Sequence, residues 1–424
     1  MPETEQSRLR VDLLIGLGLR GASAVASFIL TWLIAQIFGA RTVGLYQIGV
    51  TTASLFATVA LLGQEMVMVR KVAPLLAQNT FDLVGSHFCT ARAFVMRNGL
   101  ILWLFTSIIA VPIAYYLIDE PQAAIFIIAA APMIAINPVS RIQNAMLRCN
   151  GQVIKSQSLE GVVYTTLTIS WVVAAWLLFG QFPAWLIVLA FVSSQAIVMG
   201  IGHLLTRSFA RGEAAKKMPV EVASGARIAA SPALIMGFNW LLLIIITASM
   251  SAQAGGIFRT AFQISSIMML VSTSFGMMAG PYIARAVKSP DAWELRKILL
   301  TSGGIGTLLC LPLAAAALIF PHALMGLFGE EFITGASALQ IMAIGELVWV
   351  AGGPTGIALI MQGRERQLLW IVSASVALGI GTALLLLPTE GLAGAALGML
   401  TASVSRVLLS VGLVWISKRP AYEG

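Results

Sequence analysis

Four arginines stand inside stretches that are otherwise apolar, and their chemistry is the easiest to define. They are Arg20, Arg141, Arg259 and Arg406. The planar guanidinium fork matches the oxygens of phosphate and carboxylate groups and stays charged at physiological pH. A charged side chain at membrane depth costs about 2.5–3.5 kcal/mol even on the mildest scale, and such residues mark functional sites. These arginines therefore predict a cationic, water-accessible cavity for an anionic ligand.

Arg20 is the most isolated of the four. It lies about nine residues into the apolar segment 11–38, roughly 13 Å of helical rise from the segment's start. The nearest acid on the same segment is Asp12, two turns away. Its neighbours are small and would allow another helix to approach closely; they are Gly16, Gly18, Gly21, Ala22 and Ser23. We expect Arg20 to form one wall of the cavity.

The other candidates come from five further segments. Arg141 follows Asn137 and Pro138, and this proline, with Pro132 upstream, predicts a bend in the segment. One uncharged and one acidic residue complete the predicted site. Asn239 would contact the ligand, and Glu346 would couple transport to H+ or Na+.

Each candidate also has a structural interpretation. Arg141 and Arg259 could be interfacial arginines whose charged ends reach toward water. Arg406 could form a structural ion pair with Glu346. An asparagine such as Asn239 commonly makes a hydrogen bond between two helices. The residues alone leave these alternatives open.

The composition requires a membrane protein. Of 424 residues, 58% are hydrophobic and 10% are charged, and the mean hydropathy is +0.90. Soluble domains carry about 25% charged residues. Apolar segments long enough to cross a bilayer predict an all-α protein with twelve transmembrane helices. These are 11–38, 43–64, 94–118, 123–147, 160–180, 183–206, 226–249, 259–284, 298–320, 336–361, 367–388 and 391–416.

Lysine and arginine gather in alternate loops, which predicts the orientation. With this distribution, both termini are cytoplasmic and the chain crosses the inner (cytoplasmic) membrane many times. Between the second and third segments, the stretch 81–94 predicts a short amphipathic helix on the inner membrane surface.

The two halves of the chain look like repeats. The strings around Gly44 and Gly256 are similar, and so are those around Gly151 and Gly363; both pairs are 212 residues apart. The spacing predicts two parallel six-helix lobes, 1–206 and 226–424, joined by a cytoplasmic linker, 207–225. A solute site would lie between the lobes near mid-membrane, with access alternating between the two sides.

Several classes of function lack their sequence signals. The chain has no GxxxxGK[ST] phosphate loop, no metal-ligand spacing and no nucleophile elbow. We therefore expect no enzyme activity, no cofactor or metal, and no nucleic-acid partner.

The whole chain resembles the polysaccharide flippases of the multidrug/oligosaccharidyl-lipid/polysaccharide exporter (MOP) superfamily. The resemblance rests on the twelve segments, the GLYQIGVTTASLFATVALLG stretch (44–63) followed by Arg70, the NGQ turn (150–152) and FGEEFITGASALQIMAIGEL (328–347). Related lipid II flippases carry an arginine in the first span, similar to Arg20. Those relatives have an acid next, where this chain has Gly21.

The resemblance implies a flippase for undecaprenyl-diphosphate-linked oligosaccharides, serving surface polysaccharide biosynthesis. Membrane lipids and the polysaccharide polymerase and export machinery would be its partners. The diphosphate would meet Arg20, Arg141 and Arg406. Two alternatives remain: a drug/cation antiporter of the same superfamily, which would need an acidic cavity, and a non-transporting membrane scaffold that recruits a glycosyltransferase.

Overall fold

In the computed structural model, which describes residues 3–78, 80–209, 219–289 and 292–416, every regular element of the described chain is a helix. The helices are α1 (Glu3–Leu61), α2 (Gln64–Ala77), α3 (Phe81–Pro112), η1 (Ile113–Leu117), α4 (Gln122–Ala130), α5 (Met133–Cys149), α6 (Val153–Gln157), η2 (Ser158–Val162), α7 (Val163–Phe179), α8 (Leu186–Thr206), α9 (Val222–Ser249), α10 (Ala252–Ser265), α11 (Ile267–Lys288), α12 (Ala292–Ile319), α13 (Pro321–Gly326), η3 (Glu330–Gly335), α14 (Ala336–Met361), α15 (Glu365–Glu390) and α16 (Leu392–Ile416).

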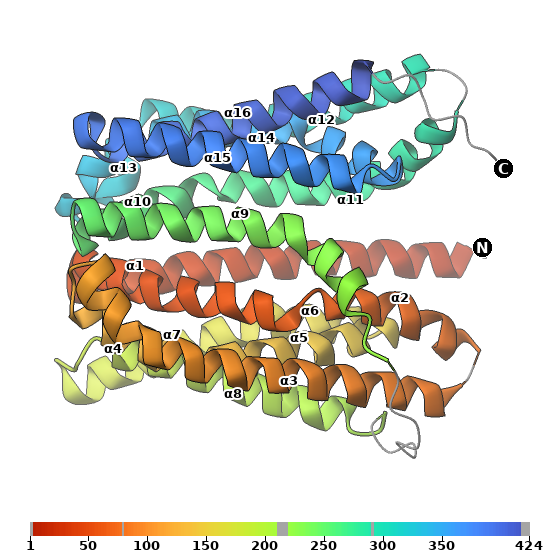
Figure 1. Cartoon of the computed structure of the whole chain (residues 1–424), viewed down its shortest axis with the longest axis horizontal. Helices are drawn as coiled ribbons and strands as arrows, with labels where there is room; N and C mark the ends of the chain where they lie inside the picture. Colours follow the sequence, from red (N-terminus) through yellow and green to blue (C-terminus); the bar gives the residue numbers. More distant parts are fainter. Residues whose placement is uncertain (1–2, 79, 210–218, 290–291, 417–424) are drawn as a thin grey trace. The chain divides into compact units, whose positions relative to one another are not determined.

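The predicted apolar segments fall on the helices labelled in Figure 1, with 123–147 divided between α4 and α5 and 259–284 between α10 and α11. Within the described residues, ten helices are long and apolar enough to cross a membrane. One of these, α1, contains two predicted segments, because Gly39 (φ 79°, ψ 177°) breaks its helical path. Such a backbone conformation favours glycine, which has no Cβ atom. The chain is therefore a multi-pass membrane protein.

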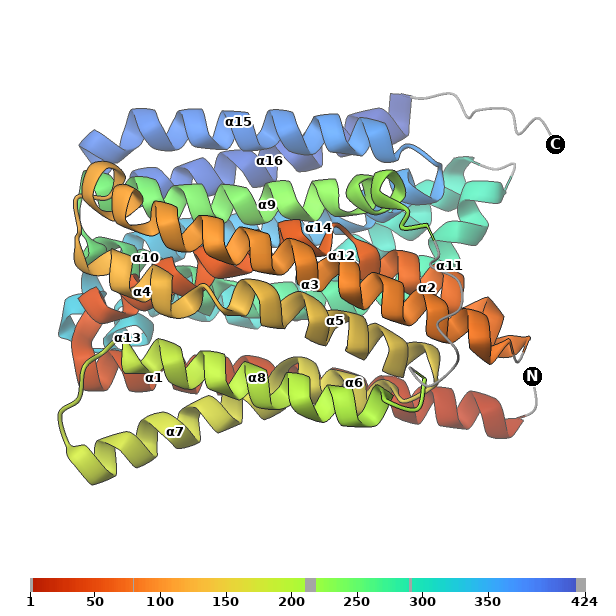
Figure 2. The same ribbon diagram turned by 60° about the horizontal axis from the view of Figure 1, so that its bottom comes forward.

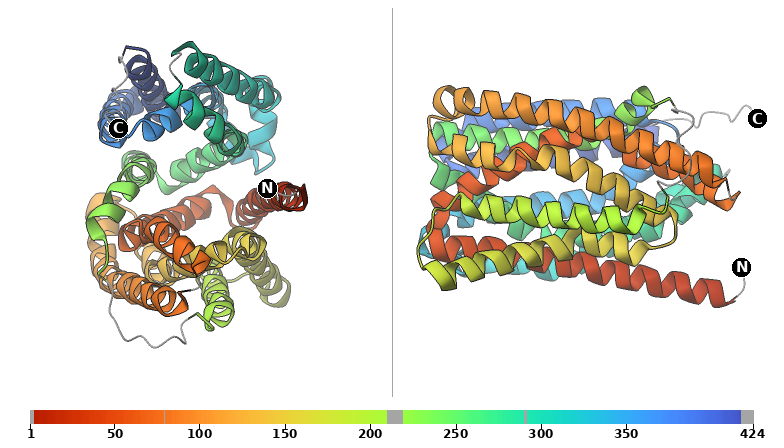
Figure 3. Two further views of the ribbon diagram at one scale, coloured as in Figure 1. Left: turned by 90° about the vertical axis from the view of Figure 1, so that its right-hand side faces the viewer. Right: turned by 90° about the horizontal axis from the view of Figure 1, so that it is seen from below.

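The chain divides into two compact units, which we describe separately. Unit 1 is Met1–Gly256 and unit 2 is Ile257–Gly424. Within each unit, the long helices run along a shared direction, as the end-on view in Figure 3 shows. The lobe boundaries expected from the sequence stay predictions, and residues 210–218 of the expected linker lie outside the described residues.

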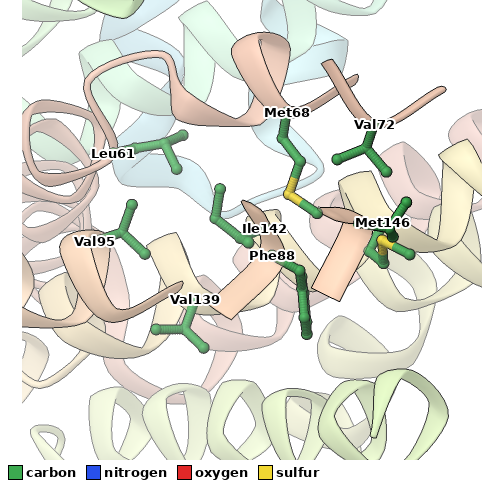
Figure 4. Close-up of a cluster of buried hydrophobic side chains, with 9 residues drawn as sticks. Leu61, Met68, Val72, Phe88, Val95, Val139, Ile142 and Met146 are labelled. Carbon is green, nitrogen blue, oxygen red and sulfur yellow. The ribbon is translucent and has the colours of Figure 1, made fainter. Parts of the chain in front are cut away.

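The prediction of a separate surface helix at 81–94 is wrong. The helix α3 is continuous from Phe81 to Pro112 and lies beside α5 (Figure 2). Phe88 and Val95 of α3 are fully buried in a cluster with Ile142 of α5 and Val72 of α2 (Figure 4). The amphipathic pattern of this stretch therefore reflects packing inside unit 1.

The 212-residue register is visible in the backbone of both units. After α5, the N–H of Gly151 donates to the Arg148 carbonyl at 3.1 Å, and Gly151 has a φ of 74°. After α14, the N–H of Gly363 donates to the Ile360 carbonyl at 3.0 Å, and Gly363 has a φ of 70°. Both glycines end a helix in the left-handed conformation that favours this residue. The two turns are built alike, as the register predicts.

The other repeated pair is a close helix crossing within unit 1. A Cβ atom at Gly44 would lie 1.9 Å from the carbonyl oxygen of Ala252. Reciprocally, a Cβ atom at Gly256 would lie 2.0 Å from the carbonyl oxygen of Ala40. Each segment thus presents an alanine and a glycine four residues apart, a spacing that lets membrane helices approach closely. Equivalent residues of the two repeats meet at this crossing.

Candidate functional site

A polar cavity of about 380 Å³ lies inside unit 1. Its lining residues are Glu65, Asn137, Ser140, Arg141, Asn144, Arg148, Leu159, Glu160, Tyr164, Gln195 and Val198. The α5 helix supplies five of them at spacings of three, four and seven residues, which place side chains on one face of a helix. The predicted bend near Arg141 takes the form of a break before α5, at Pro132, and the helix continues through Pro138.

Two irregular segments bring acids to this face. Glu65 is the second residue of α2, which begins directly after the left-handed residue Gly63 (φ 65°). A Cβ atom at Gly63 would lie 2.3 Å from the Gly225 carbonyl oxygen of α9. Both the left-handed turn and the close approach of α9 therefore require glycine at position 63. Glu160 lies in η2, a π-helical turn, and such turns are frequent at functional sites.

Arg141 is held by Glu65 in a two-point ion pair. Its Nε donates to Glu65 Oε2 at 2.8 Å, and its Nη2 donates to Glu65 Oε1 at 2.6 Å. The arginine side chain is 38% exposed and the glutamate 16% exposed. This planar arrangement fixes the guanidinium at the cavity wall. Arg141 therefore points to a carboxylate instead of reaching outward to the interface.

The second pair balances the charge of the cavity. Arg148, which lies one turn after Asn144 and two turns after Arg141 on α5, donates through Nη1 to Oε1 of Glu160. Two arginines thus face two glutamates, and the remaining polar wall consists of amide and hydroxyl groups. The cavity of unit 1 is polar without an excess of positive charge. Within the described chain, no three His, Cys, Asp or Glu side chains gather as a metal site would require.

Arg20 lies on the side of α1 that faces η2. Gly16 and Ser23, on the same helix face, approach Gln157 and Gly161: a Cβ atom at Gly16 would lie 2.6 Å from Gln157 Oε1, and one at Gly161 would lie 2.0 Å from Ser23 Oγ. The lower edge of the right view in Figure 3 shows α1 alongside these segments. The Arg20 side chain is exposed and is not part of the cavity lining.

Unit 2 holds its arginine differently. The guanidinium carbon of Arg406 in α16 lies 4.0 Å from the ring centroid of Trp349 in α14. In the described chain, no ion pair joins Arg406 to Glu346, one turn before Trp349, so the structural pair considered from the sequence is not formed. Among the described residues, Nη1 of Arg406 is buried without a hydrogen-bond acceptor.

The structure does not gather the remaining candidates at the cavity. Arg259 in α10 stacks over Phe262, with its guanidinium carbon 4.7 Å from the ring centroid. Asn239 is half-buried in α9, next to Trp240, whose Nε1 donates to Thr52 of α1 at 2.8 Å. The roles assigned to Arg20, Arg259, Asn239 and Glu346 stay predictions.

Sequence reasoning missed most of the cavity wall. Asn144, Gln195, Glu160 and Tyr164 were not selected, because single polar residues in long helices are common. The available signal was the α5 pattern, in which polar residues recur every three or four positions within an otherwise apolar segment.

Comparisons with known proteins identify the fold. No protein-family model matches the chain, and no curated protein matches it. Solved structures do match. An inward-facing multidrug resistance MATE family transporter of the MOP superfamily has a TM-score of 0.75 at 13% identity, covering 95% of this chain and 97% of that chain. The chain has the fold of MATE transporters.

Two further structures give the same result. The eukaryotic MATE transporter AtDTX14 has a TM-score of 0.67 at 14% identity, covering 97% of this chain and 96% of that chain. The MATE multidrug transporter DinF-BH, solved as a complex with a small molecule, has a TM-score of 0.66 at 18% identity, covering 97% and 95%. The MATE-like fold agrees with the predicted all-helical, two-lobe architecture.

Proposed function

We propose that this chain is a membrane transporter that flips a lipid-linked oligosaccharide across the inner membrane, and that the cavity of unit 1 receives its saccharide. The observation that carries this proposal is the chemistry of the cavity wall. Amides of Asn137, Asn144 and Gln195 and hydroxyls of Ser140 and Tyr164 offer donors and acceptors around a charge-balanced space. Such a wall suits an uncharged ligand with many hydroxyl groups.

The same wall is poorly suited to a bulky organic cation. Sites for such ligands use apolar and aromatic surfaces, with an acid to offset the charge. Among the described lining residues, the aliphatic side chains are those of Leu159 and Val198, and each glutamate already binds an arginine. The geometry therefore favours the saccharide over the cation.

A second candidate is a drug/cation antiporter, and the structural comparisons favour this class over the flippase. Three of the matched structures are described as multidrug transporters, one of them with a small molecule bound. At 13% to 18% identity, these likenesses establish the fold and leave the substrate open.

In the flippase mechanism, the saccharide occupies the cavity while the prenyl tail stays in lipid. The diphosphate binds the exposed Arg20 or Arg406, because Arg141 and Arg148 are already paired with glutamates. Outward movement of negative charge is favoured by about 2.3 kcal/mol per charge per 100 mV of inside-negative potential. Alternating access therefore needs no ATP, and Glu346 is the candidate for coupling to H+ or Na+.

Complementation separates the two functions. The wild-type chain should restore surface polysaccharide in a flippase-deficient strain, and Asn144→Leu or Gln195→Leu should remove this activity while the protein remains in the membrane. Asn98→Leu is the matched control, because Asn98 lies on α3 outside the cavity lining. Drug resistance in a sensitive strain, without polysaccharide export, would replace the flippase by the antiporter.

A further inference from the structure

The Arg406–Trp349 stack leaves the hydrogen-bonding edge of the guanidinium unused. The guanidinium carbon of Arg406 lies over the Trp349 ring, 4.0 Å from its centroid. A face contact of this kind supplies electrostatic attraction but accepts none of the five guanidinium N–H bonds. Nη1 is buried and has no acceptor among the described residues. The arginine is thus oriented by the ring and incompletely satisfied.

An unmet N–H on a charged group is unfavourable enough to require an explanation. Arg141 shows what a satisfied arginine looks like in this chain, since a carboxylate binds two of its nitrogens. Arg406 has no such carboxylate within the part of the chain that the structure describes. Glu346 lies on the same face of α14 as Trp349, yet it forms no hydrogen bond or ion pair among the described residues. A carboxylate is therefore near in the helix but is not bonded to the guanidinium.

We propose that Arg406, positioned by Trp349, is the binding group of an anion subsite in unit 2, which accepts a phosphate or carboxylate oxyanion. The guanidinium fork matches such groups with two parallel hydrogen bonds. Arg406 as a whole is only partly buried, so part of the side chain is accessible to a ligand. Glu346, one turn before Trp349 on α14, carries a like charge that weakens anion binding at this subsite.

This subsite rests on the proposed function, in which Arg406 is one of two candidates for binding the diphosphate. Binding is measured on the purified protein and needs no transport, so a failure here removes Arg406 as the diphosphate site, whereas the saccharide cavity of unit 1 is tested separately by complementation. Conversely, a chain that exports no polysaccharide can still bind an anion at Arg406.

The test is a binding titration with two probes. Sodium pyrophosphate represents a free anion, farnesyl diphosphate represents an amphiphile with the same head group, and farnesol is the uncharged control. Affinity is measured by calorimetry, and the signal of Trp349 is isolated as the fluorescence difference between wild type and Trp349→Phe. Arg406→Lys keeps the charge but loses the fork, and should weaken binding by about ten-fold or more.

A second arginine provides the matched control. Arg296 also stacks on a tryptophan of unit 2, with its guanidinium carbon 5.2 Å from the Trp415 ring centroid, but its Nη2 donates to the Trp415 carbonyl. Arg296→Lys should therefore leave anion affinity unchanged. Glu346→Gln should tighten binding, because it removes a like charge.

The two probes distinguish a lipid head group from a free anion. Arg406-dependent binding of farnesyl diphosphate assigns the subsite to an amphiphile's head group, and Arg406-dependent binding of pyrophosphate alone assigns it to a free anion. Absence of binding by both probes, or equal affinities in wild type and Arg406→Lys, would overturn the proposal. So would a Glu346→Gln variant that loses binding as Arg406→Lys does, because Glu346 would then be the partner of Arg406.

Discussion

The helix pair α5 and α8 of unit 1 and the pair α14 and α16 of unit 2 occupy equivalent places in the 212-residue register, but they are filled differently. In unit 1, Asn137 lines a cavity of about 380 Å³. Its equivalent in unit 2 is Trp349, whose ring lies against Arg406. Beside this contact, Gly352 of α14 faces Val407 of α16. A Cβ atom at Gly352 would lie 2.4 Å from Val407 side-chain carbons, so these two helices are in close contact.

The difference shows how a repeated backbone carries unlike sites. The turns after α5 and α14 have the same hydrogen bonds and the same left-handed glycine. The arginines do not correspond: Arg141 comes from α5, whereas Arg406 comes from α16. One is held by a carboxylate beside a cavity, and the other by an aromatic ring in a packed junction. The scaffold is repeated, and the chemistry is specific to each unit.

The largest expected effect comes from giving unit 1 the tryptophan of unit 2. Asn137→Trp should fill the cavity, because the indole ring must occupy the space that the asparagine lines. The measurement is thiol labelling of Asn144→Cys in a background without Cys89, Cys149 and Cys310. Labelling should nearly stop in the Asn137→Trp variant.

Thr166→Trp is the control for this substitution. Thr166 is exposed on α7 and is not part of the cavity lining, so labelling at position 144 should be unchanged. Undiminished labelling with Asn137→Trp would mean that the cavity does not reach water through this wall, and the contrast between the two units would fail.

The next effect tests how the two arginines are held. Arg141→Ala leaves Glu65 without its partner in a largely buried position, and should destabilise the protein by about 2 kcal/mol, less than a fully buried pair because Arg141 is partly exposed. The double variant Glu65→Ala/Arg141→Ala should recover part of this loss. Arg406→Ala should cost less, because it also removes an unsatisfied N–H. Thermal unfolding in detergent compares wild type with these three variants and with Glu65→Ala.

Additive effects of Glu65→Ala and Arg141→Ala would contradict the two-point ion pair. A larger loss for Arg406→Ala than for Arg141→Ala would show that the stack on Trp349 stabilises unit 2 more than the carboxylate stabilises unit 1.

The architecture could be predicted because it follows from local signals. An apolar run such as 336–361 must become a helix to satisfy its backbone in lipid, and α14 begins and ends at those residues. Gly151 and Gly363 marked their turns because few other residues accept a positive φ. The stretch 81–94 was misassigned, since an amphipathic pattern does not reveal whether its apolar face meets lipid or a neighbouring helix.

The site could be predicted only in part. Arg141 was selected for its charge, but its partner Glu65 is 76 residues away, and only the folded chain brings the two together. Gln195 and Tyr164 could not be selected from the sequence for the same reason, because only the folded chain brings them to the cavity wall. Ionic and amide contacts between distant helices depend on helix rotation, which hydropathy does not determine in a segment that is apolar on most sides.

A smaller effect tests the repeated turns. Gly151→Ala and Gly363→Ala each place a Cβ atom on a left-handed residue. Apart from the adjacent residues, no atom of the described chain lies within 4 Å of that Cβ, so backbone strain is the only expected cost, at about 1 kcal/mol each. The two variants should be equally destabilised in thermal unfolding. Asparagine at either position should cost less, because it tolerates this conformation. Unequal losses of stability would show that the two turns contribute differently to folding despite their shared geometry.

The smallest effect concerns an exposed counterpart of the Arg141–Glu65 pair. Glu221, just before α9, bonds Lys71 at 2.6 Å and Arg70 at 2.9 Å. The hydrogen bond from Lys71 and the charges of Lys71 and Arg70 lower the pKa of Glu221. Because the folded pKa lies below the unfolded one, this cluster stabilises the protein above the unfolded pKa and stops doing so as the pH falls through the folded value.

Glu221→Gln should therefore melt slightly below wild type at neutral pH, and the difference should vanish in acid. The same difference should shrink at high salt, since exposed charges are screened, whereas the Glu65–Arg141 coupling should persist. Equal salt sensitivity of both pairs would place Arg141 and Glu65 in bulk water. That result would remove the distinction between a pair that anchors the surface of unit 1 and a pair that shapes its cavity.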